Sequence, residues 1–329
     1  MDDSEFYAQL GRTGLKISKV ALGTVNFGGR VEEIEAHKLL DHAVDAGINL
    51  VDTADIYGWR VHQGFTEELL GRWIAGSPAR RDKIVLATKV GNRFGSEIND
   101  EGLSARHIVR ACEQSLRRLG TDWIDLYQMH RVDRSVAWEA AWEAMEMLVA
   151  QGKVRYVGSS NHAGWHIAAC QESAIRGHRF GLASEQCLYN LLVRNAELEV
   201  IPAAQAYGIA ILVWSPLHGG LLGGALRKLA EGRAVKSAQG RAAEALAVHR
   251  ARIAGYERFC SEIGRDPAEV GMAWVLSKPG VTAIVAGPRT PEQLDGAIRA
   301  ASAGLSCAER TRLDEMFPAL GEAPEAWLS

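Results

Sequence analysis

The sequence predicts an α/β protein of the (β/α)8 TIM-barrel class. Apolar runs of strand length alternate with segments of helical periodicity from residue 20 onward, and eight such pairs follow one another. Because a helix follows each strand, the connections are long enough for crossovers and the sheet should be parallel. The 329 residues also exceed the roughly 250 that such barrels need. A doubly wound fold is disfavoured, since residues 23–28 lack its glycine fingerprint.

The elements are expected in the following order. Residues 7–18 predict a β-hairpin, because two short alternating runs flank Gly11-Arg-Thr-Gly14. The strands are expected at residues 20–23, 49–52, 84–89, 124–130, 154–158, 183–187, 209–214 and 282–286. The helices are expected at residues 34–46, 67–74, 104–119, 136–150, 164–176, 198–207, 253–263 and 291–303. Ser104 is a typical N-cap, and Gly120 is a typical C-cap.

One domain spanning residues 1–329 is expected, because no segment rich in Pro, Gly or Ser divides the chain. Three parts exceed a minimal barrel: the hairpin, an insertion at about 219–250, and an extra C-terminal helix or tail at about 305–329. From residue 226 to residue 252 the insertion carries seven Lys or Arg and two Glu. It is either a basic lid over an anionic cofactor or a solvated helix, at about 242–254, with a linker.

Composition excludes several classes of function. The net charge of -3 gives no basic field for nucleic acid or an anionic membrane. Five widely spaced cysteines form no C-x-x-C pair, so we expect buried thiols in a reducing compartment. No apolar leader or run of membrane-spanning length occurs, and a cytoplasmic location is expected. No metal motif is present; His162 and His166 lack further ligands and are expected to cap or pack a helix.

Polar residues stand where the barrel strands are expected to end. Asp52 ends the second strand, and Tyr57 lies in the loop beyond it. Lys89 ends the third strand and His130 the fourth. Active sites of these barrels lie at the carboxyl ends of the strands, so the four side chains should converge at one face.

The types of these four groups suit proton donation to an oxygen. A phenol has a pKa of about 10 and is a weak acid at neutral pH, but a nearby ammonium such as Lys89 stabilises the phenolate. Asp52 can hold Lys89 charged, and His130 can donate to a carbonyl or relay a proton. No metal or flavin motif occurs, so a nicotinamide cofactor is expected as the hydride source. The alternative is that each group is a surface or salt-bridge residue.

This arrangement resembles the catalytic tetrad of the aldo-keto reductases. Five further motifs resemble signatures of that family: Gly47-Ile-Asn-Leu-Val-Asp-Thr-Ala54, Leu119-Gly-Thr-Asp-Trp-Ile-Asp-Leu-Tyr-Gln-Met-His130, Val157-Gly-Ser-Ser-Asn161, Trp214-Ser-Pro-Leu217 and Gly287-Pro-Arg-Thr-Pro-Glu-Gln-Leu294. The resemblance implies an NADPH-dependent barrel enzyme, usually without a metal. It implies Tyr57 as the general acid, tuned by Lys89 and Asp52, with His130 orienting the carbonyl.

The resemblance also implies where NADPH would bind. It places the nicotinamide carboxamide on Ser160, Asn161 and Gln186, and the nicotinamide ring on Trp214. It places the pyrophosphate along Ser215, Pro216, Leu217 and Gly219, the 2′-phosphate and adenine near Arg289 and Gln293, and further contacts at Gly23, Thr24 and Gly287. The chain has Gly296-Ala297 where many members have Glu-Asn on the adenine. The preference for NADPH over NADH therefore rests mainly on the guanidinium of Arg289.

A narrower resemblance concerns the substrate. Met129-His-Arg-Val-Asp-Arg134, Gly164-Trp-His-Ile-Ala168 and the ending Gly321-Glu-Ala-Pro-Glu-Ala-Trp327 are similar to a bacterial branch that contains NDP-hexose 2,3-enoyl reductases of deoxysugar biosynthesis. A nucleotide-linked 4-keto sugar would then be the substrate, with Trp59, Arg93 and Arg131 as candidate contacts. The alternatives are a general aldehyde or ketone reductase, and a slow-turnover NADPH-sensing binding subunit like the channel-associated β subunits.

Overall fold

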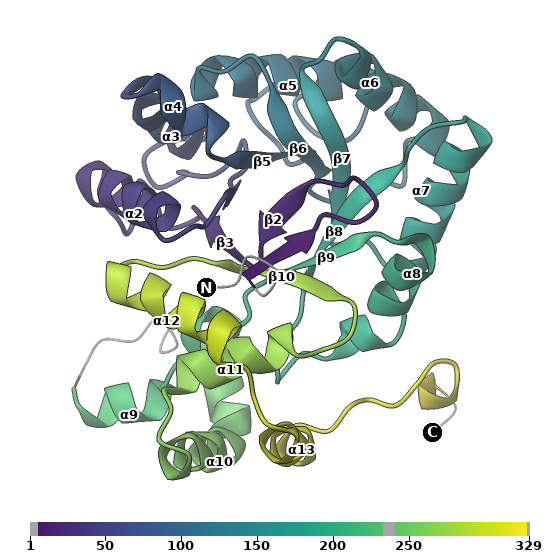
Figure 1. Cartoon of the computed structure of the whole chain (residues 1–329). Helices are drawn as coiled ribbons and strands as arrows, with labels where there is room; N and C mark the ends of the chain where they lie inside the picture. The colour runs from purple at the N-terminus through teal and green to yellow at the C-terminus, as the bar shows by residue number, and fades with distance from the viewer. Residues whose placement is uncertain (1–5, 233–240, 328–329) are drawn as a thin grey trace.

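Eight parallel strands close into a barrel, which confirms the predicted fold class. The computed structural model describes residues 6–232 and 241–327. Neighbouring strands follow the order β10-β3-β4-β5-β6-β7-β8-β9, so the last strand closes against the first (Figure 1). The predicted N-terminal hairpin forms a separate two-stranded antiparallel sheet. Within the described ranges, no helix is both long enough and apolar enough to cross a membrane.

The strands and helices have the following bounds. The hairpin strands are β1 (Tyr7–Gln9) and β2 (Lys16–Ser18). The barrel strands are β3 (Val20–Gly23), β4 (Leu50–Asp52), β5 (Val85–Val90), β6 (Ile124–Met129), β7 (Val154–Ser160), β8 (Leu182–Leu188), β9 (Ala210–Trp214) and β10 (Val281–Ala286). The α-helices are α2 (Glu33–Asp45), α3 (Phe65–Ala75), α4 (Pro78–Asp82), α5 (Ala105–Leu119), α6 (Trp138–Ala150), α7 (Gly164–Arg176), α8 (Val200–Tyr207), α9 (Ala225–Ala230), α10 (Arg241–Glu262), α11 (Pro267–Leu276), α12 (Pro291–Ala303) and α13 (Cys307–Met316). Short 3-10 turns are η1 (Asn195–Glu197), η2 (His218–Gly220) and η4 (Glu325–Trp327).

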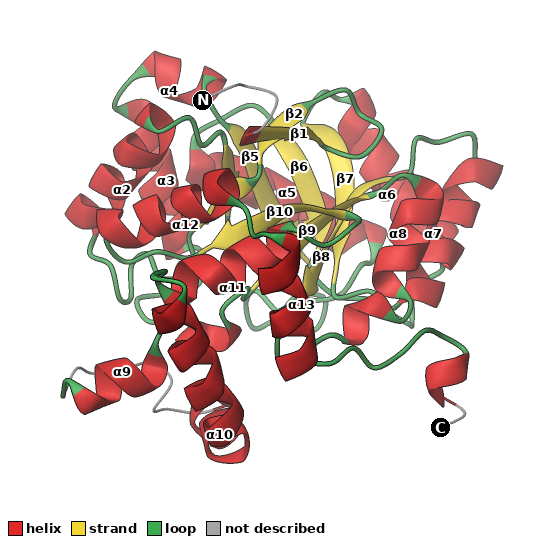
Figure 2. Ribbon diagram, turned by 60° about the horizontal axis from the view of Figure 1, so that its bottom comes forward, coloured by secondary structure: helices red, strands yellow, loops and turns green. Residues whose placement is uncertain are grey.

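The hairpin plugs one end of the barrel. Leu10 and Ile17 are fully buried there, each burial being worth about 1.5–3 kcal/mol. They join a cluster made by small and apolar residues of the strands, namely Ala21, Leu50, Val85, Ala87, Leu126, Ala183, Ala210, Leu212, Ala283 and Val285. The hairpin lies at the top in Figure 2, and α9 lies beyond the opposite end of the barrel. The amino ends of the strands are therefore closed, and only the carboxyl ends are open for a site.

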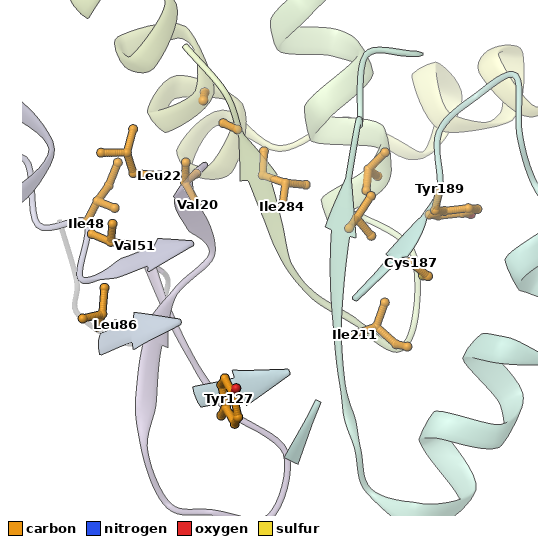
Figure 3. Packing of buried hydrophobic residues seen from close by; sticks show 14 of the residues in the cluster. Val20, Leu22, Ile48, Val51, Leu86, Tyr127, Cys187, Tyr189, Ile211 and Ile284 are labelled. Carbon is orange, nitrogen blue, oxygen red and sulfur yellow. The ribbon is translucent and has the colours of Figure 1, made fainter. Parts of the chain in front are cut away.

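The alternate residues of each strand face the helices and form the larger part of the core. Val20, Leu22, Val51, Leu86 and Ile284 belong to this outer layer (Figure 3). Successive side chains of a strand point to opposite faces, so the neighbours of these residues point into the barrel. This alternation decides which residues near a strand end can reach a site inside the barrel mouth.

Helix α5 illustrates why the predicted helices form. Its N-cap Ser104 accepts a hydrogen bond from the N–H of His107, and Gly120 ends it in the left-handed conformation that favours glycine. Arg117 and Arg118 lie in the last turn, where positive charge is favourable. Both predicted caps of this helix are confirmed.

The region after β9 differs from the prediction in two respects. The helices expected at about 242–254 and 253–263 are one continuous helix, α10. Helix α11 was not predicted at all, although Asp266 caps its start and Pro267 occupies its first turn. Most of α11 is buried, so it has no polar face and shows no amphipathic period. Residues 233–240, in the middle of the predicted insertion, lie outside the described residues.

The chain after β10 contains the extra C-terminal helix that was predicted. This helix, α13, follows α12 and begins with a capping box in which Ser306 and Glu309 each accept from the other's backbone N–H. Leu313 and Phe317 are buried in the main core cluster, so the helix is anchored to the barrel by apolar contacts.

Candidate active site

The open end of the barrel is lined by polar side chains. They lie on the same interior faces of the strands as the apolar cluster that closes the other end. Leu50 belongs to the plug, and Asp52, two residues later on β4, points to the same interior face. The same step leads from Ala87 to Lys89 on β5, and from Leu126 to Gln128 on β6. The barrel interior therefore changes from apolar to polar toward the carboxyl ends.

The carboxylate of Asp52 accepts hydrogen bonds from three other side chains of the polar layer. Its Oδ2 accepts a hydrogen bond from Lys89 Nζ at 2.7 Å. Its Oδ1 accepts from Gln186 Nε2 at 2.8 Å and from Gln128 Nε2 at 3.1 Å. The carboxylate is thus satisfied by three donors and has no need of a substrate to be stable in its buried position.

Lys89 is held as a buried ammonium. Its side chain is 0% exposed, and its Nζ also donates to the carbonyl of Thr53 at 2.7 Å. Burial is the largest single effect and would lower the pKa of Lys89, but the charges of Asp52 and Tyr57 and the hydrogen bonds to them together outweigh it, and the pKa is raised. Lys89 is therefore a fixed positive charge at neutral pH.

Tyr57 lies above this charge, in the loop between β4 and α3. Lys89 Nζ is 5.1 Å from the centroid of its ring. Burial disfavours the phenolate and raises the pKa of Tyr57, although the charge of Lys89 opposes the rise. The expectation from sequence named only the lowering effect of Lys89; in the structure burial is the larger effect. The phenol is therefore protonated at neutral pH, as a proton donor must be.

His130 follows β6 directly and faces Tyr57, with the two ring centroids 6.1 Å apart. The pKa of His130 is lowered to about 3, first by burial and then by the positive charges of Lys89 and Arg131. Its Nδ1 is buried without a hydrogen-bond partner among the described residues. The lowered pKa indicates an imidazole that is neutral at physiological pH and can donate a hydrogen bond.

The neutral state of His130 predicts the acid limb of the pH profile. We expect kcat to show no ionisation near pH 6.5 as the pH falls from 8 to 5, since His130 charges only near its lowered pKa of about 3. Steady-state rates at saturating substrate, with the fold followed by circular dichroism, would measure this. An ionisation near 6.5 that disappears in His130→Gln would contradict the assignment.

Residues assigned to the nicotinamide lie side by side at the ends of β7 and β9. Trp214 Nε1 donates to Asn161 Oδ1 at 3.0 Å. Asn161, with a positive φ of 60°, donates from Nδ2 to the carbonyl of His130 at 3.1 Å. Ser160 donates from its hydroxyl to the carbonyl of Gln186 at 2.8 Å. The half-buried indole of Trp214 is therefore fixed against the catalytic loop.

The loop after β9, which was assigned to the pyrophosphate, is also tied in place. Asn190 Nδ2 donates to the carbonyl of Ser215 at 3.1 Å, and Gly219 N–H donates to the hydroxyl of Ser215 at 2.9 Å. Pro216 is buried and Leu217 is half-buried. The loop thus has a defined shape without any ligand.

The remaining predicted cofactor residues come from β3 and from the loop after β10. Thr24 donates its hydroxyl to the carbonyl of Asp52 at 3.0 Å, and a Cβ on Gly23 would come within 2.8 Å of Val285. The carbonyl of Gly287 accepts from Asn26. Gln293 Oε1 accepts from the backbone N–H of Arg289 at 2.9 Å. The guanidinium of Arg289 has no partner among the described residues and remains available for an anion.

The three predicted substrate contacts differ in their surroundings. Trp59 is 54% exposed, and its ring centroid lies 6.2 Å from that of Tyr57. Arg131 is exposed beside His130. Arg93 is bound by both carboxylate oxygens of Glu101, at 3.2 and 2.7 Å, so its charge is balanced within its own loop. Trp59 and Arg131 therefore remain the stronger candidates.

Two contributors to the site were not predicted. Gln128 donates to Asp52, and its place two residues before His130, on the same strand face, was a signal for it. Arg30 lies in the loop after β3 near Arg60 and Arg289. No sequence motif marks it, because its neighbours in space are far away along the chain.

Comparison with known proteins decides the family. The profile of the Aldo/keto reductase family matches residues 19–317. The chain belongs to the aldo/keto reductase family. It is 46% identical over 328 residues to the "Uncharacterized oxidoreductase YrpG" of Bacillus subtilis (strain 168), which covers 98% of this chain and 99% of that protein. It is 33% identical over 340 residues to a versiconal hemiacetal acetate reductase of Aspergillus parasiticus, covering 94% and 96%.

A third relative has a different kind of name. A probable voltage-gated potassium channel subunit beta of Oryza sativa subsp. japonica is 33% identical over 297 residues, covering 88% of each chain.

The family membership makes this aldo/keto reductase an oxidoreductase enzyme, and members generally use NAD(P)H. The side chains present fit such a cofactor: the indole of Trp214, the amide of Asn161 and the guanidinium of Arg289, which has no partner in the described part of the chain.

Proposed function

We propose that this aldo/keto reductase reduces the carbonyl group of an aldehyde or ketone with NADPH, and that Tyr57 is the proton donor. The observation that carries the proposal is the position of the Tyr57 phenol between the Lys89–Asp52 pair and the imidazole of His130. A panel of aldehydes and ketones, assayed by oxidation of NADPH, tests it. Absence of turnover on every carbonyl compound would overturn it.

The mechanism follows from the states of these groups. NADPH supplies a hydride to the carbonyl carbon when it is bound beside Trp214. As charge develops on the carbonyl oxygen, Tyr57 gives it the phenolic proton, and His130 donates a hydrogen bond to it. The ammonium of Lys89 stabilises the phenolate that remains until it regains a proton from water. Asp52 keeps Lys89 charged and in place without touching the substrate.

The preference for NADPH is tested at Arg289. The exposed guanidinium of this residue suits the extra phosphate of NADPH, and a charged hydrogen bond of this kind is worth about 10–100-fold in affinity. We expect Arg289→Met to raise the Kd for NADPH by about that factor and to leave the Kd for NADH within about twofold. Titration of cofactor fluorescence would measure both.

Arg299 provides the control for this variant. It lies in α12, the helix that follows the loop of Arg289, and both its Nε and its Nη2 donate to Glu269, at 2.8 and 2.6 Å. Arg299→Met should change neither Kd. Equal losses of NADPH and NADH affinity in Arg289→Met would refute the phosphate role.

The nucleotide-linked sugar remains a narrower prediction. For an enone, hydride addition at the β carbon would leave an enolate oxygen for Tyr57 and His130 to stabilise, so the same site serves both reactions. Comparing a dehydratase-generated sugar nucleotide with simple aldehydes would separate the two. The binding-subunit alternative predicts tight NADPH binding with slow turnover on every carbonyl compound tried.

A further inference from the structure

We propose that Arg30 and Arg60 form an anion-recognising subsite at the barrel mouth, which holds a carboxylate or phosphate group of the carbonyl substrate. This inference rests on the proposed function, because it places the reacting carbonyl at Tyr57. It names a substrate class that the tetrad does not specify: aldehydes or ketones that carry a negative charge some distance from the carbonyl.

A cavity lies where this subsite is proposed. It has a volume of about 160 Å³ and lies between the loop after β3 and the loop after β4. Val25, Phe27 and Trp59 give it apolar walls, and Arg30 and Arg60 supply its positive charge. Trp59 also contacts Tyr57, with ring centroids 6.2 Å apart. The cavity wall that Trp59 forms is therefore continuous with the ring of the proposed proton donor.

Gly29 leaves the space that the side chain of Arg60 occupies. The side chain of Arg60 lies directly across this glycine, and a Cβ there would come within 2.7 Å of Arg60 Cδ and 3.3 Å of its Cβ. Any other residue at 29 would push the stem of Arg60 away. Because residue 29 has no side chain, the stem of Arg60 packs over the loop that carries Arg30, and both arginines line the same cavity.

The charge in this cavity is not balanced by the protein. Among the described residues, neither guanidinium makes a hydrogen bond or an ion pair with a carboxylate, whereas Arg93 at the same mouth is bound by Glu101. The pKa of Arg30 is lowered by its partial burial and then by the positive charges of Arg60 and Arg289. Clustered like charges in a partly enclosed cavity are unfavourable, and a bound anion relieves that repulsion.

Arg289 lies near this pair but is assigned to the cofactor. The loops are linked, because Asn26 Nδ2 donates to the carbonyl of Gly287 at 2.8 Å, and β10, β3 and β4 are neighbours in the barrel (Figure 1). The test must therefore separate an anion on the substrate from the phosphates of the cofactor.

Three benzaldehydes that differ only in the para substituent provide the test: 4-carboxybenzaldehyde, 4-formylphenyl phosphate and the neutral methyl 4-formylbenzoate. We expect kcat/KM to be at least about 10-fold higher for an anionic compound than for the ester. Arg60→Met keeps the stem over Gly29. It should lower kcat/KM for the anionic compounds about 10-fold and leave kcat/KM for the ester within about twofold of the wild-type value. The ratio of kcat/KM for the phosphate compound to kcat/KM for the carboxylate compound identifies which anion the subsite prefers.

Arg134→Met is the matched control, since Arg134 is an exposed arginine of the loop after β6 outside this cavity. It should change none of the three rates. Binding of terephthalate, a dianion that cannot be reduced, gives a readout independent of turnover. Calorimetry on the NADPH complex should show about 10-fold weaker binding in Arg60→Met and in Arg30→Met.

The outcomes separate the two proposals. If the wild-type enzyme reduces no aldehyde but binds terephthalate through Arg60, the proposed function fails and the subsite stands. If it reduces all three aldehydes at equal kcat/KM, the subsite is overturned and the function stands. A rise in the Kd for NADPH in Arg60→Met, with the anion preference unchanged, would assign the pair to the cofactor and also overturn the inference.

Discussion

Replacing Tyr57 by phenylalanine is expected to abolish carbonyl reduction while the fold and NADPH binding are preserved. The variant removes one oxygen from a partly exposed ring and leaves the Lys89–Asp52 pair intact. Loss of a general acid costs about 10²- to 10⁴-fold in rate, and no other phenol is placed at this site. Steady-state kcat on a simple aldehyde, with the Kd for NADPH from fluorescence titration, measures both parts.

Tyr7→Phe is the control for the loss of a hydroxyl. Tyr7 lies in the hairpin strand β1, at the closed end of the barrel and away from the mouth, and its hydroxyl donates to the carbonyl of Gly47 at 2.7 Å. Its variant should lose about 1 kcal/mol of stability and keep full turnover. If Tyr57→Phe kept turnover within about tenfold of the wild type, the proton would have to come from another group, and the acid role of Tyr57 would be wrong.

The barrel itself could be predicted because its signals are local. Each strand is a short apolar run and each following helix has an amphipathic face, so the order of elements fixes the topology almost alone. Helix α11 escaped prediction because it is buried nearly all round between α10 and α12, and such a helix shows no periodic polar face. Its capping residues, Asp266 and Pro267, were the available signal.

The site was predictable as far as strand ends could be located. Asp52, Lys89 and His130 lie at or next to the carboxyl ends of successive strands, and the barrel brings such positions together whatever the loops do. Gln128 could have been included by the two-residue period that relates it to His130. The pairing of Arg30 with Arg60 could not, because it depends on the path of two loops and on the contact of Arg60 with Gly29.

The sequence could not predict how burial and the charge of Lys89 combine to set the pKa of Tyr57. The identity of its neighbours shows that Lys89 will favour the phenolate, but only the structure shows how deeply the hydroxyl is buried. Burial raises the pKa of Tyr57 more than Lys89 lowers it. In the proposed mechanism the ammonium of Lys89 therefore acts mainly after proton transfer, by stabilising the phenolate that has formed.

Removing the charge of Lys89 is expected to cost both stability and catalysis. Lys89→Met would leave the Asp52 carboxylate buried with only the amides of Gln128 and Gln186 as donors. The Lys89 and Asp52 side chains are 0% and 3% exposed, and breaking a buried pair from one side costs about 3–5 kcal/mol. Urea unfolding should show this loss. Turnover should fall with it, because the phenolate of Tyr57 would lose its nearest positive charge.

The double variant Asp52→Asn with Lys89→Met separates the two losses. An asparagine at 52 can still accept from both glutamines, and no unpaired charge remains in the barrel, so most of the stability should return. Activity should not return, since nothing then stabilises the phenolate. If the double variant were as unstable as the sum of the two single variants, the pair would not act as a unit. If it recovered turnover, Lys89 would have no electrostatic role in the reaction, and its position beneath Tyr57 would be purely structural.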